Sequence, residues 1–258
     1  MTPDEMTDTS LNTSLEVADI AVTYPNGHRA IHDVSFSLRG GVTCALVGVN
    51  GSGKSTLFNA IIGIVHPQMG TVRINGLPVA QALKRNSVAY VPQSGSVDWD
   101  FPARVIDVVL MGRYAHLGWI KRPTKSDREI ALKMLERVGM MDFVERQISQ
   151  LSGGQQQRVF LARALAQQAD MYFMDEPFKG VDAQTEKSFI KLLKELRDEG
   201  KTIIMVHHDL QTVAAYFDYL VMVNVTIKAK GRTEEVFTQE NLNNCYRADY
   251  SGKEGVTQ

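Results

Sequence analysis

The sequence predicts an α/β fold with a mostly parallel core sheet, an antiparallel β subdomain at its N-terminal end and an inserted helical subdomain. Two short apolar runs, MYFMD at residues 171–175 and TIIMV at residues 202–206, indicate strands buried on both faces, and a helical pattern precedes each run. A third apolar run, VTCALVG at residues 42–48, leads into a glycine-rich turn and then an apolar helix. Strands that alternate with helices are typical of a parallel sheet.

Antiparallel strands are expected before this core. Apolar residues roughly alternate at residues 15–24, and they alternate again at residues 34–38, after an Asn-Gly turn. A period of two on either side of an Asn-Gly pair indicates a β-hairpin. Residues 1–14 are acidic and polar, and we expect them to form a disordered tail.

The middle of the chain has a helical character. We expect a helical subdomain at about residues 94–160, inserted in a main domain of residues 15–240. Within it, SDREIALKMLERVG predicts a helix that begins with a capping box of Ser126 and Glu129. The polar residues 241–258 are expected to form a C-terminal tail.

Composition argues against several classes of protein. The 258 residues carry a formal net charge of −1, so no global basic field indicates a nucleic-acid partner. The two cysteines are too few for a disulfide framework and favour a reducing cytoplasm. No run approaches the roughly 18 apolar residues of a membrane span, so we expect a protein that is not itself integral to a membrane.

A phosphate loop is the most specific motif. GVNGSGKST, at residues 48–56, fits G-x-x-x-x-G-K-[ST] between a buried strand and a helix. In this motif backbone N–H groups point at phosphate oxygens, the lysine places its charge on the β- and γ-phosphates, and the next hydroxyl binds Mg²⁺. A glycine-rich turn without a ligand is the alternative. The residues expected to bind nucleotide are Gly48, Asn50, Gly51, Ser52, Gly53, Lys54, Ser55 and Thr56.

Two acidic residues, Asp175 and Glu176, stand at the end of the second buried strand. Alone they would indicate a turn or a helix cap. Beside a phosphate loop, an acid at a neighbouring strand end is what Mg²⁺ requires, so Asp175 is the expected metal-side residue. Glu176 is then expected to polarise the attacking water, and a positioned base typically contributes about 10²–10⁴ in rate.

The third buried strand ends in His207, His208 and Asp209. Paired histidines allow a metal site, although the sequence offers no evident third ligand nearby. They also allow one buried and one solvent-facing histidine without a catalytic role. The favoured interpretation places one histidine beside the γ-phosphate, and only one of the two can serve because adjacent strand residues face opposite ways.

LSGGQQQR, at residues 151–158, predicts a helix start that contains two glycines. Ser152 and Gln155 fit a capping box. Gly153 and Gly154 each cost up to about 1 kcal/mol relative to alanine inside a helix, and somewhat less in its first turn. Glycine suits a backbone that another group approaches closely, and a helix N-terminus attracts anions. From this stretch alone, a plain cap and an anion site both remain open.

In the order in which they occur along the chain, the motifs resemble those of the nucleotide-binding subunits of ATP-binding cassette (ABC) transporters, from about residue 15 to about residue 239. The resemblance implies the ABC-ATPase form of the P-loop NTPase fold, with ATP and Mg²⁺ as ligands. It implies that Tyr24 stacks on adenine and that Gln93 touches Mg²⁺ and the attacking water. The implied catalytic residues are Glu176, His208 and Gln93, and the implied Mg²⁺ ligands are Ser55, Gln93 and Asp175.

The same resemblance implies a second copy of the chain in a head-to-tail dimer. ATP held by the phosphate loop of one copy would then contact two motifs of the other copy. These are the signature motif LSGGQ, at residues 151–155, and the D-loop, at residues 180–182. The residues expected to act across the dimer are Ser152, Gly153, Gly154, Gln155 and Asp182. Spacing and periodicity by themselves do not indicate this dimer.

The resemblance extends to a branch of importers. A chain without membrane segments resembles a subunit that docks on a separate integral membrane permease, at the cytoplasmic face of the membrane. Residues 94–119 resemble those of manganese, zinc or iron importers, manganese most closely, which implies an extracytoplasmic metal-binding protein as an indirect partner. Trp99 and Trp119 are expected either to receive the permease's cytoplasmic helix or to fill the subdomain core. The alternative function is a soluble ABC ATPase with no role in transport.

Lys179 departs from the pattern of the resembled family, which mostly has a small or aliphatic residue at this position. An exposed loop lysine is one interpretation. The other hypothesis places Lys179 near the dimer interface, where its charge would bias closure.

Overall fold

The structure, a computed structural model, describes residues 13–93, 102–117 and 122–246. Its N-terminal part is an antiparallel sheet in the order β2-β1-β4-β5. The strands are β1 (Thr13–Thr23), β2 (Arg29–Arg39), β4 (Met69–Ile74) and β5 (Leu77–Pro78). The expected hairpin is confirmed: β1 pairs with β2, and the Gly27 N–H closes the turn onto the Tyr24 carbonyl oxygen at 2.9 Å.

The second sheet has six strands in the order β10-β9-β3-β8-β7-β6, and only the β9–β10 pair is antiparallel. The strands are β3 (Thr43–Val47), β6 (Val88–Val91), β7 (Met171–Asp175), β8 (Thr202–Val206), β9 (Tyr219–Asn224) and β10 (Thr226–Arg232). The three apolar runs predicted as buried strands are β3, β7 and β8, which lie side by side. The predicted mostly parallel core sheet is therefore confirmed.

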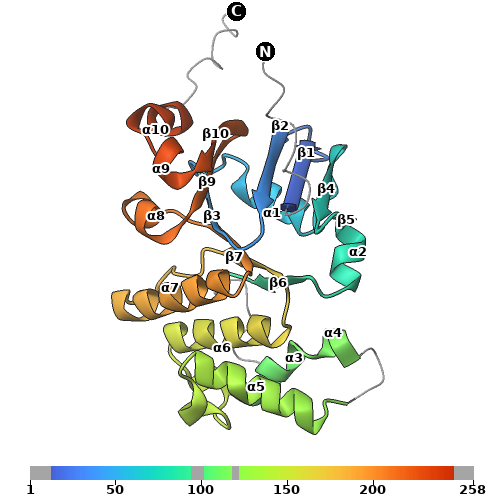
Figure 1. Ribbon diagram of the computed structural model, residues 1–258, viewed down its shortest axis with the longest axis vertical. Helices are drawn as coiled ribbons and strands as arrows, with labels where there is room; N and C mark the ends of the chain where they lie inside the picture. Colours follow the sequence, from blue (N-terminus) through green and yellow to red (C-terminus); the bar gives the residue numbers. More distant parts are fainter. Residues whose placement is uncertain (1–12, 94–101, 118–121, 247–258) are drawn as a thin grey trace, which may run out of the picture.

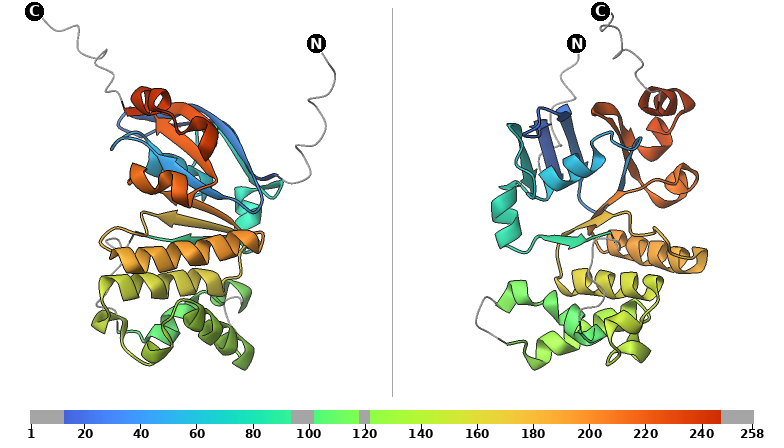
Figure 2. Two further views of the ribbon diagram at one scale, coloured as in Figure 1. Left: turned by 60° about the vertical axis from the view of Figure 1, so that its left-hand side comes forward. Right: turned by 180° about the vertical axis from the view of Figure 1, so that it is seen from behind.

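Helices cover this sheet and form the inserted subdomain (Figure 1). They are α1 (Lys54–Ile61), α2 (Val79–Lys84), α3 (Val105–Met111), α4 (Tyr114–Leu117), α5 (Lys125–Arg137), α6 (Gly153–Ala166), α7 (Ala183–Asp198), α8 (Leu210–Tyr216), α9 (Thr233–Val236) and α10 (Gln239–Tyr246), with 3₁₀ turns at Met141–Phe143 and Ile148–Gln150. In all three views α3, α4, α5 and α6 gather at the end of the molecule away from the antiparallel sheet (Figure 2). Among the described residues, no helix combines the length and the apolar character needed to cross a bilayer.

Two apolar cores lie on the two faces of the parallel sheet. Cys44 and Leu46 of β3 belong to the core around α1, and Ala45 and Val47 belong to the core on the side of α6 and α7. This division follows from the alternation of side chains along a strand. It also explains why the run is apolar throughout, since both faces of β3 are covered.

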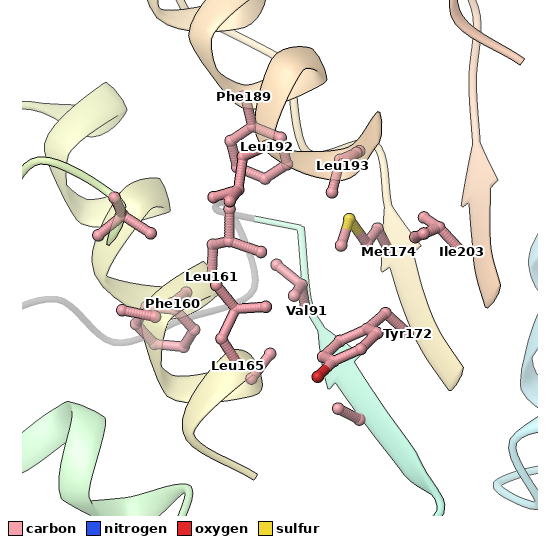
Figure 3. Close-up of a cluster of buried hydrophobic side chains, with 14 of the residues drawn as sticks. Val91, Phe160, Leu161, Leu165, Tyr172, Met174, Phe189, Leu192, Leu193 and Ile203 are labelled. Atoms are coloured by element: carbon pink, nitrogen blue, oxygen red, sulfur yellow. The ribbon is translucent and has the colours of Figure 1, made fainter. Parts of the chain in front are cut away.

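Helices α6 and α7 pack together over β7 (Figure 3). Leu161 of α6 faces Leu192 and Phe189 of α7, with Met174 of β7 nearby, whereas Phe160 lies on the other side of α6. Burying one such side chain contributes about 1.5–3 kcal/mol. This core therefore fixes the start of α6 relative to the end of β7.

The helix predicted at residues 126–139 begins earlier than expected. The capping box consists of Thr124 and Asp127, not Ser126 and Glu129, and α5 starts at Lys125. The Thr124 N–H donates to Asp127 Oδ2 at 2.9 Å, while the other oxygen of Asp127 accepts from Arg113 Nε at 3.0 Å. The ion pair of Asp127 with the buried Arg113 favours this capping box over the predicted one.

Parts of both predicted tails, residues 1–14 and 241–258, belong to regular elements of the structure. Strand β1 includes Thr13 and Ser14, and Ser14 Oγ lies 3.1 Å from Thr202 Oγ1. At the other end, α10 runs from Gln239 to Tyr246 with Cys245 fully buried, so the boundary at residue 240 falls inside a packed helix. Residues 1–12, 94–101, 118–121 and 247–258, and with them Trp99 and Trp119, lie outside the described residues.

Candidate active site

The predicted site residues follow four adjacent strands of the parallel sheet. Strands β3, β8, β7 and β6 are neighbours in that order. The phosphate loop follows β3, His208 follows β8, Glu176 follows β7 and Gln93 follows β6. Because the carboxyl ends of parallel strands meet at one edge, these side chains converge there, the usual location of a ligand site in such sheets.

The glycines of the phosphate loop have steric reasons inside this chain. A Cβ on Gly48 (φ 155°) would lie 2.0 Å from the Val223 carbonyl oxygen, and one on Gly53 (φ 92°) would lie 2.3 Å from Ile31 Cγ2. Gly51 has φ 79° with open space around it. Residues with side chains rarely adopt these backbone angles, so the loop requires glycine.

Lys54, the first residue of α1, is buried and folded back into the loop. Its Nζ donates to the Gly48 and Val49 carbonyl oxygens at 2.9 and 2.8 Å. Burial lowers the pKa of Lys54, while Glu176 and Asp175 act in the opposite direction. Ser52 is buried as well, and its hydroxyl has no hydrogen-bond partner within the described part of the chain. The loop thus holds a cation and an unused hydroxyl, which suits a phosphate ligand.

Tyr24 lies beside the phosphate loop, just after β1. Its hydroxyl is 3.0 Å from Thr56 Oγ1 of α1, and 37% of the residue is exposed. Sequence reasoning assigned both residues to the nucleotide site but did not anticipate this contact. It ties the antiparallel sheet to the loop.

Glu176 is the centre of the polar cluster after β7. Its Oε1 lies 2.5 Å from His208 Nε2, and its Oε2 accepts from Gln93 Nε2 at 3.4 Å. Glu176 has φ 45°, an unusual angle for a residue other than glycine, which costs of order 1–3 kcal/mol and is typical of functional sites. Its neighbour Asp175 is partly buried, and burial followed by repulsion from Glu176 raises the pKa of Asp175.

Lys179 also contacts Glu176, at 3.7 Å from Nζ to Oε2, which the sequence did not indicate. Its side chain is 66% exposed, so it is a loop lysine that nevertheless pairs with the candidate base. Glu176, Lys179 and His208, together with Asn50 of the phosphate loop, line a cleft of about 510 Å³.

The two histidines face opposite ways, as strand alternation requires. His207 is buried among Phe178, Tyr216 and Phe217, with Nε2 2.7 Å from Thr212 Oγ1. Burial lowers the pKa of His207, which keeps its ring neutral. His208 instead reaches Glu176. Both histidines line the cleft, but His208 contacts Glu176 whereas His207 packs among aromatic rings.

The start of α6 fits the predicted cap. Ser152 and Gln155 form a capping box, with Ser152 N–H to Gln155 Oε1 at 3.0 Å and Gln155 N–H to Ser152 Oγ at 3.4 Å. A Cβ on Gly153 would meet nothing within 4 Å, and one on Gly154 would meet Thr185 Cγ2 only at 3.7 Å. Unlike the loop glycines, these two have no steric reason within one chain.

Asp182 is the N-cap of α7. It accepts hydrogen bonds from the N–H groups of Gln184 and Thr185 at 3.0 and 2.9 Å. A Cβ on Gly154 would lie 3.9 Å from Asp182 Oδ2, so the predicted D-loop adjoins the predicted signature motif. In the described part of the chain, no hydrogen bond joins either of them to the phosphate loop.

A separate apolar groove lies between the parallel sheet and the helical subdomain. It measures about 340 Å³ and includes the large exposed side chains of Ile64, Leu83 and Met111. Arg163 and Tyr90 form its floor, with Arg163 Nη2 donating to the Tyr90 carbonyl oxygen at 3.4 Å. Exposed apolar residues that gather in one groove mark a surface for another molecule.

Comparisons with known proteins show what the chain is similar to. A protein-family model described as ABC transporter matches residues 31–179. The chain is 53% identical to the chelated iron transport system membrane protein YfeB of Yersinia pestis, over 88% of this chain and 77% of that protein. It is 52% identical to the zinc transport system ATP-binding protein TroB of Treponema pallidum, over 90% and 86%. It is 51% identical to the manganese transport system ATP-binding protein MntB of Bacillus subtilis, over 90% and 92%.

A solved structure matches the fold as well. It is an ATP-binding cassette of an ABC transporter in its ADP conformation, with a TM-score of 0.77 and 28% identity, covering 90% of this chain and 94% of that chain.

Proposed function

The chain belongs to the ABC transporter family of ATP-hydrolysing proteins, and on that premise we propose that it powers the import of a divalent metal ion through a separate membrane permease. The observation that carries the catalytic assignment is the Glu176 carboxylate, with His208 at 2.5 Å and Gln93 at 3.4 Å. A carboxylate with two polar contacts beside a phosphate loop is suited to hold and activate a water.

ATP would lie along the phosphate loop. Tyr24 would stack on the adenine, and Lys54 would turn its amine from the loop carbonyls to the β- and γ-phosphates. The backbone N–H groups of Asn50 to Ser55 would bind phosphate oxygens, and the start of α1 favours negative charge there. The proposed ATP contacts are Tyr24, Gly48, Asn50, Gly51, Ser52, Gly53, Lys54, Ser55 and Thr56.

The donor set at the loop fits Mg²⁺. Ser55 is exposed at the start of α1, and Asp175 and the Gln93 amide complete a group of oxygen ligands, which Mg²⁺ prefers. Mg²⁺ usually keeps several waters and binds through one or two protein ligands together with substrate phosphates. When bound, Mg²⁺ would neutralise charge on the phosphates.

In hydrolysis, Glu176 would accept a proton from the attacking water while Gln93 helps to orient that water. His208 would donate a hydrogen bond to the γ-phosphate. Because Glu176 Oε1 already contacts His208, the base and the phosphate-binding histidine would act as one unit. Lys179, also near Glu176, is proposed to bias closure of the dimer through its charge.

A second copy is proposed to complete each ATP site. Ser152, Gly153, Gly154, Gln155 and Asp182 of one copy would contact the nucleotide of the other. What supports this is the open space beside Gly153 and Gly154, since glycine is unnecessary there for a single chain.

The apolar groove is the proposed docking site for the permease. Ile64, Leu83 and Met111 would receive an apolar face of a cytoplasmic segment of the permease, which places the chain at the cytoplasmic face of the membrane. Relatives whose names specify iron, zinc and manganese support a metal ion as cargo, delivered by an extracytoplasmic binding protein. Manganese is our proposed cargo. A soluble ABC ATPase without a transport role is the alternative.

The test compares wild type with Glu176→Gln, alone and with the permease in vesicles. We expect Glu176→Gln to bind ATP and to hydrolyse it about 10²–10⁴ times more slowly. Near wild-type turnover would remove Glu176 from the role of base. ATP-driven uptake of manganese, but not of zinc or iron, would support the cargo, whereas turnover that no permease stimulates would support the soluble alternative.

A further inference from the structure

The last helix, α10, ends against the far side of the phosphate loop. Asn224, at the end of β9, donates from Nδ2 to the Cys245 carbonyl oxygen at 3.0 Å. Cys245 is fully buried, and its Sγ donates to the Val223 carbonyl oxygen at 3.7 Å. These contacts attach the end of α10 to the turn that joins β9 and β10, residues 223–225, which we call the β9–β10 turn.

The β9–β10 turn contacts the phosphate loop on its other side. The Val225 N–H donates to the Ser52 carbonyl oxygen at 2.9 Å. The Val223 carbonyl oxygen lies so close to Gly48 that a Cβ there would be 2.0 Å away. Val225 has φ 61°, which is strained for a β-branched residue and persists only where the surroundings impose it. The turn is therefore held between the loop and α10.

Tyr246, the last residue of α10, is half-buried and packs against the same apolar core as Leu220 and Met222 of β9. Burial raises the pKa of Tyr246 to about 12 and that of Cys245 to about 11. Both groups are thus neutral at physiological pH and contribute contacts rather than charge.

We propose that α10 braces the phosphate loop through the β9–β10 turn, and that Asn224 is a positioning residue for ATP binding that acts through Ser52 and Gly48. The loop carries glycines with positive φ angles, and glycine gives a free loop many accessible conformations. Holding the loop in one conformation before ATP arrives reduces the conformational entropy that is lost on binding. The inference rests on ATP binding by this loop and adds a part of the chain that the ATP site motifs do not include.

The first test measures the affinity of a fluorescent ATP analogue for Asn224→Ala. The change removes the hydrogen bond to the end of α10, so we expect affinity to fall about 2- to 10-fold. In turnover assays KM should rise by more than kcat falls, because the brace prepares the loop and does not touch the reacting atoms. Asn244→Ala, on the exposed side of the same helix, is the matched control and should bind like wild type.

The second test uses amide hydrogen exchange on the wild-type chain. Coupling is reciprocal, so saturating ATP should slow exchange in α10 as well as in the loop. Wild-type affinity in Asn224→Ala, or exchange in α10 that ATP leaves unchanged, would overturn the brace. Failure of the wild-type chain to bind the analogue at all would instead contradict the proposed function.

Discussion

Alanine at Gly153 and Gly154 should stabilise the chain and lower its ATPase activity by roughly 10²-fold. Both glycines lie in the first turn of α6, neither has a positive φ, and both have room for a methyl group. A single copy of the protein therefore has no reason to reject alanine at these positions.

The expected gain in stability follows from helix propensity. Replacing glycine by alanine where the backbone angles fit contributes about 0.4–1 kcal/mol, and less in a first turn than in the middle of a helix. The double variant should gain about 1 kcal/mol, which for a domain of this size raises the unfolding temperature by about 2–4 °C.

The expected loss of activity follows from the proposed dimer. If the γ-phosphate held by a second copy approaches these backbone N–H groups, a methyl group there displaces it by about 1 Å, which can cost roughly 10²-fold in rate. Stability and activity should thus change in opposite directions.

The assay is thermal unfolding and ATP turnover of the double variant beside wild type. Gly112→Ala is the contrasting control, since a Cβ there would lie 2.1 Å from the Arg163 carbonyl oxygen and should destabilise the chain. A double variant that hydrolyses ATP at the wild-type rate would refute the reasoning, and a destabilised double variant would refute the account of α6.

Three further outcomes test other parts of the structure. Asp127→Asn breaks the buried ion pair with Arg113 and should cost about 3 kcal/mol in urea unfolding at pH 7. Hydrogen bonds from Thr124, and then from Arg113, lower the pKa of Asp127 from 3.8 to about 2. The greater free energy of unfolding of wild type should therefore persist above about pH 4 and disappear as the pH falls through about 2. A difference in stability that does not depend on pH would contradict this. Met111→Asp, in the apolar groove, should abolish metal uptake and leave ATP turnover of the isolated chain unchanged, whereas lost ATP binding would mean that Met111 is structural. Gln157 is 2% exposed, and its amide has no hydrogen-bond partner in the described ranges. Gln157→Met should therefore stabilise the chain by about 1 kcal/mol in urea unfolding. A destabilised variant would mean that the amide does have a hydrogen-bond partner.

The sequence predicted the parts of the fold whose signals are local. Strands β3, β7 and β8 are covered on both faces and are therefore apolar runs, which the sequence makes visible. The motif residues that follow these strands could be placed at one edge of the sheet, because the carboxyl ends of parallel strands meet there. The capping pattern was less specific, because Ser126 with Glu129 and Thr124 with Asp127 both fit it, and only the buried Arg113 decides between them.

Contacts between distant parts of the chain were not predictable from one sequence. The pairs Asn224 with Cys245 and Val225 with Ser52 join a late hairpin to the C-terminal helix and to the phosphate loop. No local pattern encodes them, because each depends on which strands are neighbours. The contact of Lys179 with Glu176 is local, three residues apart, but it depends on the conformation of the turn after β7, which no residue pattern specified.

The most direct test of the account is the mass of Glu176→Gln in solution, measured by light scattering with and without Mg²⁺ and ATP. The chain has a mass of 28.7 kDa, and we predict that ATP converts it to a species of twice that mass. Gly154→Asp in the same background places a carboxylate where the partner's γ-phosphate would lie and should remain a monomer. A Glu176→Gln chain that stays a monomer at saturating ATP, beside a wild type that hydrolyses ATP at full rate as a monomer, would contradict the account.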